Sequence, residues 1–193
     1  MKSSLLNMVL SLGLITVIAA AALAGVYSAT KEPIAKANAE KQKNAISEVL
    51  PGITFDNVPS DDAIPVTVDG DADAVTVFPA MQGGQMVGAA VESYSNNGFS
   101  GLIKVMYGFD AEGNITGYAV MQHAETPGLG SKMGEWFSNP AHTIVGLNSE
   151  KNNLTVSKDG GDVDAITAAT ISSRAFLDAL TRADKAYRQA SAK

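Results

Sequence analysis

The sequence predicts an α+β protein in which one apolar N-terminal helix is followed by a single domain of antiparallel strands and a C-terminal helix. Three observations predict this fold class. Residues 3–30 carry no charged side chain, residues 64–122 contain short apolar runs separated by turn residues, and residues 173–190 repeat apolar side chains at helical spacing. A chain of 193 residues has room for about one domain.

The composition excludes several classes of function. Hydrophobic residues make up 46% of the chain and charged residues 18%, which favours a packed core over disorder. The net charge of -6, without a basic patch, argues against a nucleic-acid partner. The chain has no cysteine and only two histidines, His123 and His142, so thiolate, iron–sulfur and structural zinc sites are not expected. We therefore assign no metal ligand and no catalytic residue.

The uncharged N-terminal segment predicts a membrane anchor. Its apolar part, from Leu5 to Val26, is long enough for one membrane-spanning helix of about 20 residues. The small residues of AALAGVYSA also fit the cleavage site of a signal peptide, which is the alternative. We expect a retained single-pass anchor over residues 1–30 in the lipid bilayer of the cytoplasmic (inner) membrane. Its N-terminus then lies inside the cell and the domain on the extracytoplasmic, periplasmic side.

Residues 31–52 form a predicted helical linker, which begins near Pro33 and either stands alone or continues the membrane helix. Residues 53–193 form the predicted domain, with a C-terminal amphipathic helix over residues 173–190. Turn residues bound the candidate strands and place two hairpins among them. The strands are expected at 66–68, 75–77, 87–91 and 102–106, and the hairpins at 105–122, turning at 111–114, and at 152–167, turning at 159–160.

The stretch HAETPGLGSKM, residues 123–133, is a candidate ligand loop. Its Pro127, Gly128 and Gly130 favour a turn that lets the backbone approach a ligand closely. The same stretch offers a hydroxyl at Thr126, an apolar surface at Leu129 and polar groups at His123 and Glu125. The alternative is an ordinary strand-to-helix turn that leads into a short helix at SKMGEWFS.

The stretch DAITAATISS, residues 164–173, is the second candidate, because it leads into the C-terminal helix. Ser172 or Ser173 is expected to cap that helix, and a helix N-terminus attracts phosphate through its free amides and its dipole. The small side chains of Ala165, Ala168 and Ala169 allow a bulky ligand to lie against the backbone. A capped helix without a ligand is the alternative.

Taken together, the two stretches resemble the signatures of FMN-binding domain proteins. DAITAAT resembles the flavinylation motif of that family, in which Asp, two residues, Ser or Thr, Gly, Ala and Thr follow one another. The matching positions are Asp164, Thr167, Ala169 and Thr170, and Ala168 stands where the family usually has glycine. HAETPGLG resembles the family loop that lies against the flavin, and NGFSG, residues 97–101, resembles a third family element.

The resemblance implies a covalent cofactor. In the family, a flavin transferase takes FAD as donor and joins FMN through its phosphate to the last threonine of the motif, which is Thr170 here. Asp164 then belongs to the motif that the transferase recognises, while Ala168 and Ala169 make room for the cofactor. The expected contacts with the phosphate or ribityl chain come from Thr167 and Ser172.

The loop residues complete the implied FMN site. Thr126 and Leu129 are expected to touch the flavin ring, Glu125 to orient the loop, and Gly130 to let the backbone come close. Thr170 itself performs no redox chemistry, since that chemistry belongs to the cofactor.

The resemblance covers nearly the whole chain and is greatest to the RnfG family, which belongs to the Rnf complexes, the ion-translocating ferredoxin:NAD oxidoreductases. It implies a membrane-anchored electron carrier that belongs to an enzyme only together with other membrane subunits. The sequence has no Rossmann glycine fingerprint, so NAD and ferredoxin are expected to bind elsewhere in the complex. The alternatives are the C subunit of a sodium-translocating NADH:quinone oxidoreductase, a lone extracytoplasmic flavoprotein reductase, and an anchored scaffold module without flavin.

Overall fold

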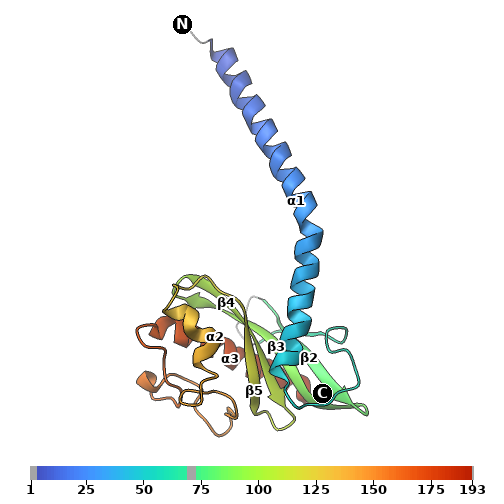
Figure 1. Cartoon of the computed structure of the whole chain (residues 1–193), viewed down its shortest axis with the longest axis vertical. Coiled ribbons are helices and arrows are strands. Elements are labelled where there is room, and N and C mark those ends of the chain that lie inside the picture. Colours follow the sequence, from blue (N-terminus) through green and yellow to red (C-terminus); the bar gives the residue numbers. More distant parts are fainter. Residues whose placement is uncertain (1–3, 69–72, 193) are drawn as a thin grey trace. The chain divides into compact units, whose positions relative to one another are not determined.

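The computed structural model describes residues 4–68 and 73–192 of the chain (Figure 1). The chain divides into two units, Met1–Lys41 and Gln42–Lys193. Its helices and strands follow in the order α1 (Leu5–Val49), β1 (Ile64–Val66), β2 (Val75–Gln82), β3 (Gln85–Gly98), β4 (Gly101–Asp110), β5 (Ile115–Gln122), η1 (Gly130–Lys132), α2 (Met133–Trp136), η2 (Ser157–Asp159) and α3 (Thr170–Ser191). The predicted α+β class is confirmed.

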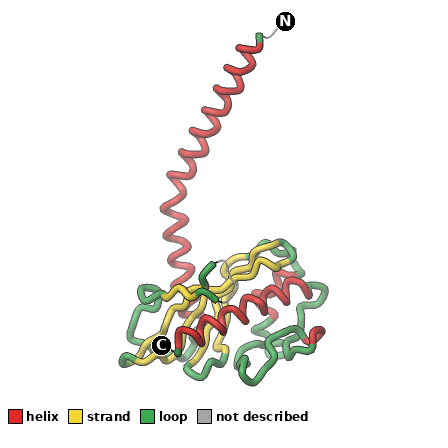
Figure 2. The backbone as a smooth tube through the Cα atoms, turned by 180° about the vertical axis from the view of Figure 1, so that it is seen from behind, coloured by secondary structure: helices red, strands yellow, loops and turns green. Residues whose placement is uncertain are grey.

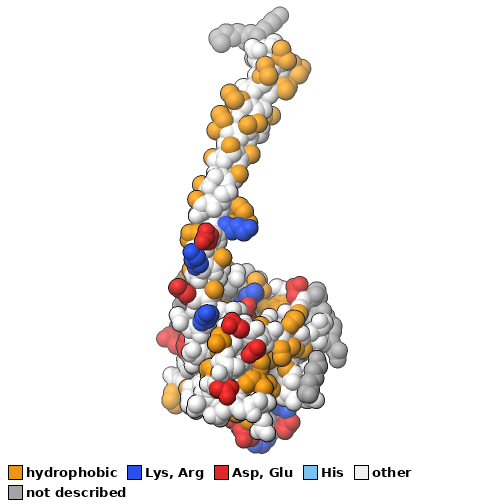
Figure 3. Space-filling model, turned by 90° about the vertical axis from the view of Figure 1, so that its right-hand side faces the viewer, with side chains coloured by type: hydrophobic (Ala, Val, Ile, Leu, Met, Phe, Trp, Pro, Cys, Tyr) orange, Lys and Arg blue, Asp and Glu red, His pale blue; other side chains and the backbone are white. Residues whose placement is uncertain are grey.

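The first unit consists of most of helix α1, which runs for 45 residues and contains Pro33 in its interior. The predicted linker helix is therefore a continuation of the apolar helix. The helix is long and apolar enough to cross a membrane, with a mean hydropathy of 2.4 in its most apolar window. Its apolar side chains are exposed, and Figure 3 shows them along the part of the helix that carries no charged side chain. Such a surface is stable in an apolar environment rather than in water.

The second unit is built on a five-stranded antiparallel sheet in which each strand pairs with its neighbours in sequence, in the order β1-β2-β3-β4-β5. The predicted hairpin over 105–122 is confirmed as β4 and β5. Asp110 forms its turn, because its Oδ1 accepts hydrogen bonds from the backbone N–H groups of Glu112 and Asn114. The strands expected at 75–77, 87–91 and 102–106 are also present, whereas β1 begins at Ile64 and ends at Val66.

Both faces of the sheet are covered. Helix α3 packs on one face, where the Tyr107 hydroxyl donates a hydrogen bond of 2.7 Å to the backbone oxygen of Phe176. The last turns of α1 cover the other face, with Ile46 and Val49 packed against β-strand side chains such as Phe78. Figure 2 shows α3 lying across the strands. This packing holds the first turn of α3 next to one end of the sheet, where the candidate site lies.

Two further sequence predictions differ from the structure, one in a hairpin and one in a helix boundary. The hairpin expected over 152–167 is wrong: the segment forms η2 and a single bridge between Val156 and Val163. Hydrogen bonds from Ser157 N to Val163 O and from Gly161 N to Val156 O close the loop before two strands can pair. The C-terminal helix begins at Thr170 rather than at residue 173, because its first turns continue the turn over residues 166–169.

Candidate functional site

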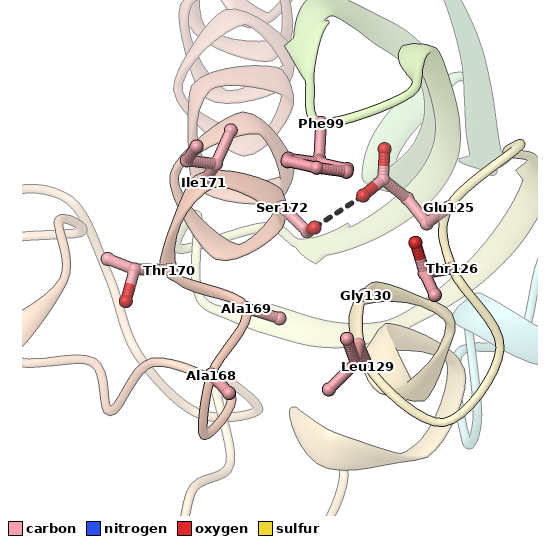
Figure 4. Close-up of a pocket in the computed structure, with 10 residues that line it drawn as sticks. All are labelled: Phe99, Glu125, Thr126, Leu129, Gly130, Ala168, Ala169, Thr170, Ile171 and Ser172. Atoms are coloured by element: carbon pink, nitrogen blue, oxygen red, sulfur yellow. Dashed lines mark hydrogen bonds between the residues drawn. The ribbon is translucent and has the colours of Figure 1, made fainter.

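A cavity of about 320 Å³ lies at the N-terminal end of α3. Three segments that are distant in sequence form its walls: the β3–β4 turn, the loop after β5, and the turn that leads into α3 (Figure 4). Its lining residues are Phe99, Glu125, Thr126, Leu129, Gly130, Ala168, Ala169, Thr170, Ile171 and Ser172. The cavity therefore brings together every predicted site residue except Asp164 and Thr167.

The Glu125 carboxylate joins the three segments. It is buried, with 5% of its surface exposed, and its Oε2 accepts a hydrogen bond from the Ser172 hydroxyl on α3 (Figure 4). Its Oε1 accepts a hydrogen bond of 2.9 Å from the backbone N–H of Ser100 in the β3–β4 turn. Hydrogen bonds from both neighbouring segments compensate for burying the carboxylate, so Glu125 positions the walls of the cavity.

Two glycines allow this close packing. A Cβ at Gly130 would lie 2.4 Å from the Ser172 hydroxyl oxygen and 2.6 Å from Glu125 Oε2. A Cβ at Gly98 would lie 2.8 Å from Glu125 Oε1. Real Cβ atoms do not come this close to other atoms, so any larger residue at either position displaces the carboxylate. Gly98 in NGFSG and Gly130 in HAETPGLG thus both leave room for the Glu125 carboxylate.

Exposed apolar side chains surround the mouth of the cavity. Leu129 is 40% exposed, Ile171 48% and Phe99 67%. Leu129 was predicted from the loop sequence, whereas Phe99 and Ile171 were missed. The only sequence signal for Phe99 is its place inside NGFSG, and Ile171 carries none. An apolar mouth with a few polar groups is typical of sites that bind a flat ring system.

The N-terminus of α3 has no side-chain cap within the described part of the chain. Its N-cap residue is Ala169, and the expectation that Ser172 or Ser173 caps the helix is wrong. The Ser172 hydroxyl is bound to Glu125, and the Ser173 hydroxyl accepts a hydrogen bond from Ile166 N and donates one to Ala169 O. The first-turn N–H groups and the helix dipole thus remain available for an anion.

Thr170, the first residue of α3, carries a hydroxyl at this helix N-terminus. Its side chain is half-buried and points away from Phe99 and Ser172 (Figure 4). Lys158 Nζ donates a hydrogen bond of 3.3 Å to Thr170 Oγ1. Lys158 was not predicted, because nothing in the sequence shows that residue 158 folds back onto residue 170. The hydroxyl of the first residue of α3 therefore lies within hydrogen-bond distance of an ammonium group.

Ala168 adopts a left-handed conformation in the turn before α3. Its φ is 60°, and it is the only non-glycine residue with positive φ among the described residues. In the flavinylation motif that the sequence resembles, this position is glycine, which adopts a positive φ without strain. A residue with a Cβ is strained there by about 1–2 kcal/mol.

Asp164 and Thr167 line a second cavity, of about 450 Å³, together with Trp136, His142 and Lys158. Asp164 is held there by two contacts: its Oδ2 lies 3.3 Å from His142 Nδ1, and its backbone oxygen accepts a hydrogen bond from Trp136 Nε1. The rings of Trp136 and His142 stack with centroids 4.3 Å apart. Ala168 lines both cavities, so the turn before α3 separates these two predicted residues from the others.

The first cavity suits a particular class of ligand. Apolar side chains and small residues form its mouth, while the helix N-terminus, Thr170 and Lys158 form an anion site beside it. This combination suits a ligand that joins an apolar ring system to an anionic group. Fold and site together thus define a small-molecule-binding domain for a ligand of that class.

Comparison with known proteins agrees with this class. Residues 98–185 match the FMN-binding domain family, and residues 1–49 match the RnfG N-terminal region. The G subunit of the ion-translocating oxidoreductase complex of Aliivibrio fischeri is 34% identical over 94% of this chain and 87% of that protein. The corresponding G subunit of Cereibacter sphaeroides is 36% identical over 94% of this chain and 83% of its own length. The chain belongs to this RnfG family, which confirms the resemblance found in the sequence.

Proposed function

We propose that this chain is a membrane-anchored electron-transfer subunit of an Rnf-type complex and that it carries FMN bound covalently to Thr170. The FMN-binding domain and the RnfG relatives support the electron-transfer role. The observation that carries the covalent site is the position of Thr170: its hydroxyl lies at an uncapped helix N-terminus, within hydrogen-bond distance of Lys158, beside an apolar cavity.

The cavity can hold the ring system of FMN but not the whole cofactor. Its volume of about 320 Å³ is at the lower end for small-molecule sites, which is enough for a ring system but not for the whole of FMN. Phe99, Leu129 and Ile171 offer apolar contacts to the ring, and Thr126 offers a hydroxyl. The phosphate belongs at the N-terminus of α3, where the helix dipole and Lys158 both favour an anion.

Attachment requires one exchange of bonds at phosphorus. The Thr170 hydroxyl oxygen attacks the phosphorus on the FMN side of the FAD pyrophosphate, which a flavin transferase supplies. The bond between Thr170 Oγ1 and phosphorus forms, and the bond from that phosphorus to the bridging oxygen breaks. AMP leaves with this oxygen, and the hydroxyl proton passes to a base of the transferase. Oxidation states do not change, and the product diester carries one negative charge.

When bound, FMN supplies reversible electron transfer, which none of the protein side chains at this site provides. The residues of this chain then hold and orient the cofactor. Glu125 keeps the loop after β5 against α3, and Leu129 and Phe99 shield the flavin ring from water. The overall reaction, electron transfer from ferredoxin to NAD coupled to ion movement, belongs to the complex with its other membrane subunits.

Helix α1 supports the membrane span in the proposed topology. Residues 1–30 form the anchor in the inner membrane, residues 31–52 the helical linker, and residues 53–193 the FMN domain on the periplasmic side. The long apolar stretch of α1 supports the span, and the match of residues 1–49 to the RnfG N-terminal region supports a retained segment. Protease treatment of intact spheroplasts should digest the domain and leave the anchor in the membrane. Protection of the domain would contradict this orientation.

The attachment is tested by expressing the full chain with its partner subunits and an active transferase. Ultraviolet fluorescence of the denatured protein on a gel, with peptide mass spectrometry, should find FMN on the Thr170 peptide. Thr170→Ala should abolish the fluorescent band. The matched control is Thr181→Ala, which removes an exposed hydroxyl on the same helix that donates to Leu177 O and should leave the band unchanged. A wild-type chain without flavin would refute the proposal.

A further inference from the structure

Arg174 and Asp159 form an ion pair near Thr170, the proposed attachment residue, and neither of them lines the first cavity. Arg174 Nε donates to Asp159 Oδ2 at 2.7 Å, and Arg174 Nη2 donates to Asp159 Oδ1 at 2.7 Å. This two-point contact fixes the orientation of the two side chains as well as their distance. The Arg174 guanidinium also holds the pKa of the Asp159 carboxyl below its ordinary value, so both partners are charged at neutral pH.

The ion pair joins two segments that are distant in sequence. Asp159 is the last residue of η2, and Arg174 lies in the second turn of α3. The η2 segment is short and is closed at its base by the hydrogen bond from Ser157 N to Val163 O. Fixing Asp159 against α3 therefore fixes the residue next to it, which is Lys158.

Lys158 makes the second contact between η2 and α3. Its Nζ lies 3.3 Å from Thr170 Oγ1, and Thr170 and Arg174 are four residues apart on α3. Residues four apart lie on the same face of a helix, one turn from each other. The η2 segment is thus held at two successive turns along one face of α3, and the Lys158 ammonium points at the attachment hydroxyl.

The ion pair also keeps the Asp159 carboxylate from engaging the Lys158 ammonium near Thr170. Asp159 is adjacent to Lys158 in sequence, so an unpaired Asp159 carboxylate would compete for the Lys158 ammonium. Because Arg174 engages both oxygens of Asp159, the Lys158 charge remains available for an anion at Thr170.

We propose that the Arg174–Asp159 ion pair is a positioning device, which presents the Lys158 ammonium to the phosphate that becomes attached to Thr170. The inference rests on the proposed function, since it assigns these residues a role in the same attachment. Lys158 favours the added negative charge directly, and Arg174 and Asp159 act through Lys158.

A merely structural role is distinguishable from this one. Arg174 and Asp159 keep 52% and 42% of their side-chain surface exposed, and exposed ion pairs contribute little to folding stability. Loss of the pair should therefore lower the melting temperature of the full chain only slightly, by about 2 °C or less, while it slows modification severalfold. A structural role would lower the melting temperature by clearly more than that.

The test measures the initial rate of FMN incorporation into the full chain in membranes, with FAD and the transferase supplied. Lys158→Gln, Arg174→Gln and Asp159→Asn should each slow incorporation by about threefold to fivefold, since one screened charge interaction is involved. The double variant Lys158→Gln with Arg174→Gln should be no slower than Lys158→Gln alone, because Arg174 acts through Lys158. Arg174→Lys, which keeps the charge but loses the two-point contact, should fall between Arg174→Gln and wild type.

The controls are Lys151→Gln and Lys185→Gln, which remove exposed lysines from the loop before η2 and from α3 and should incorporate FMN at the wild-type rate. Equal rates for wild type and Arg174→Gln, or additive losses in the double variant, would overturn the inference. Absence of FMN from wild type would instead overturn the proposed function, so the two failures are distinct.

Discussion

Replacing Ala168 by glycine should stabilise the domain. Ala168 has a φ of 60°, in a turn where the N–H of Ala169 donates to Ile166 O at 3.0 Å. A Cβ in this left-handed region costs about 1–2 kcal/mol, which glycine avoids. Glycine loses about 0.4–1 kcal/mol through the greater entropy of the unfolded chain. The difference leaves a net gain of about 0–1.6 kcal/mol, with a central value near 0.8 kcal/mol.

A gain of that size is measurable by thermal unfolding. For a chain of this length, about 1 kcal/mol shifts the melting temperature by about 2–4 °C. The assay is the melting of the purified full chain in detergent, followed by circular dichroism, without FMN so that cofactor binding does not contribute. Ala165→Gly is the matched control, because Ala165 lies in the same segment outside any helix and has no positive φ. It should lower stability by about 0.4–1 kcal/mol.

A melting temperature that Ala168→Gly lowers as much as Ala165→Gly does would refute the expected relief of strain at residue 168. That result would mean that residue 168 does not occupy the left-handed region in solution. A gain, together with unchanged or faster FMN incorporation, would show that alanine at this position is tolerated at a cost in backbone strain alone.

Three further predictions concern the core and the charges around the site. Gly130→Ala should destabilise the domain by about 1–3 kcal/mol in urea unfolding and reduce FMN incorporation, because its Cβ would displace the Ser172 hydroxyl; unchanged stability would contradict the close packing. Tyr107→Phe should cost about 1 kcal/mol, since it removes a buried hydrogen bond to a backbone oxygen of α3; a neutral result in the same assay would refute that contribution. Arg174 lowers the pKa of the Asp159 carboxyl in the folded state. The small contribution of the ion pair to folding stability is therefore present above the unfolded-state pKa of about 4, and it is lost as the pH falls through the folded-state pKa. Melting temperatures of wild type and Asp159→Asn should therefore converge at acid pH, and a constant difference would contradict this linkage.

Sequence patterns alone determined the features that depend on near neighbours. The apolar segment that begins α1 follows from hydropathy, and the β4–β5 hairpin follows from strand-like runs on either side of the turn residues 111–114. The two family-like stretches also identified most of the cavity wall, because they resemble signatures of FMN-binding domain proteins. Such sequence patterns span only a few neighbouring residues, so they can be recognised without knowledge of the tertiary fold.

Only the tertiary structure decided how distant segments combine. Phe99 reaches the cavity because the β3–β4 turn meets α3, and Lys158 reaches Thr170 because the η2 segment folds back onto α3. Ser172 is not a helix cap because α3 begins at Thr170, and its hydroxyl instead bonds a buried carboxylate from another loop. These contacts depend on which surfaces pack together, and packing is a property of the whole chain that no local spacing encodes.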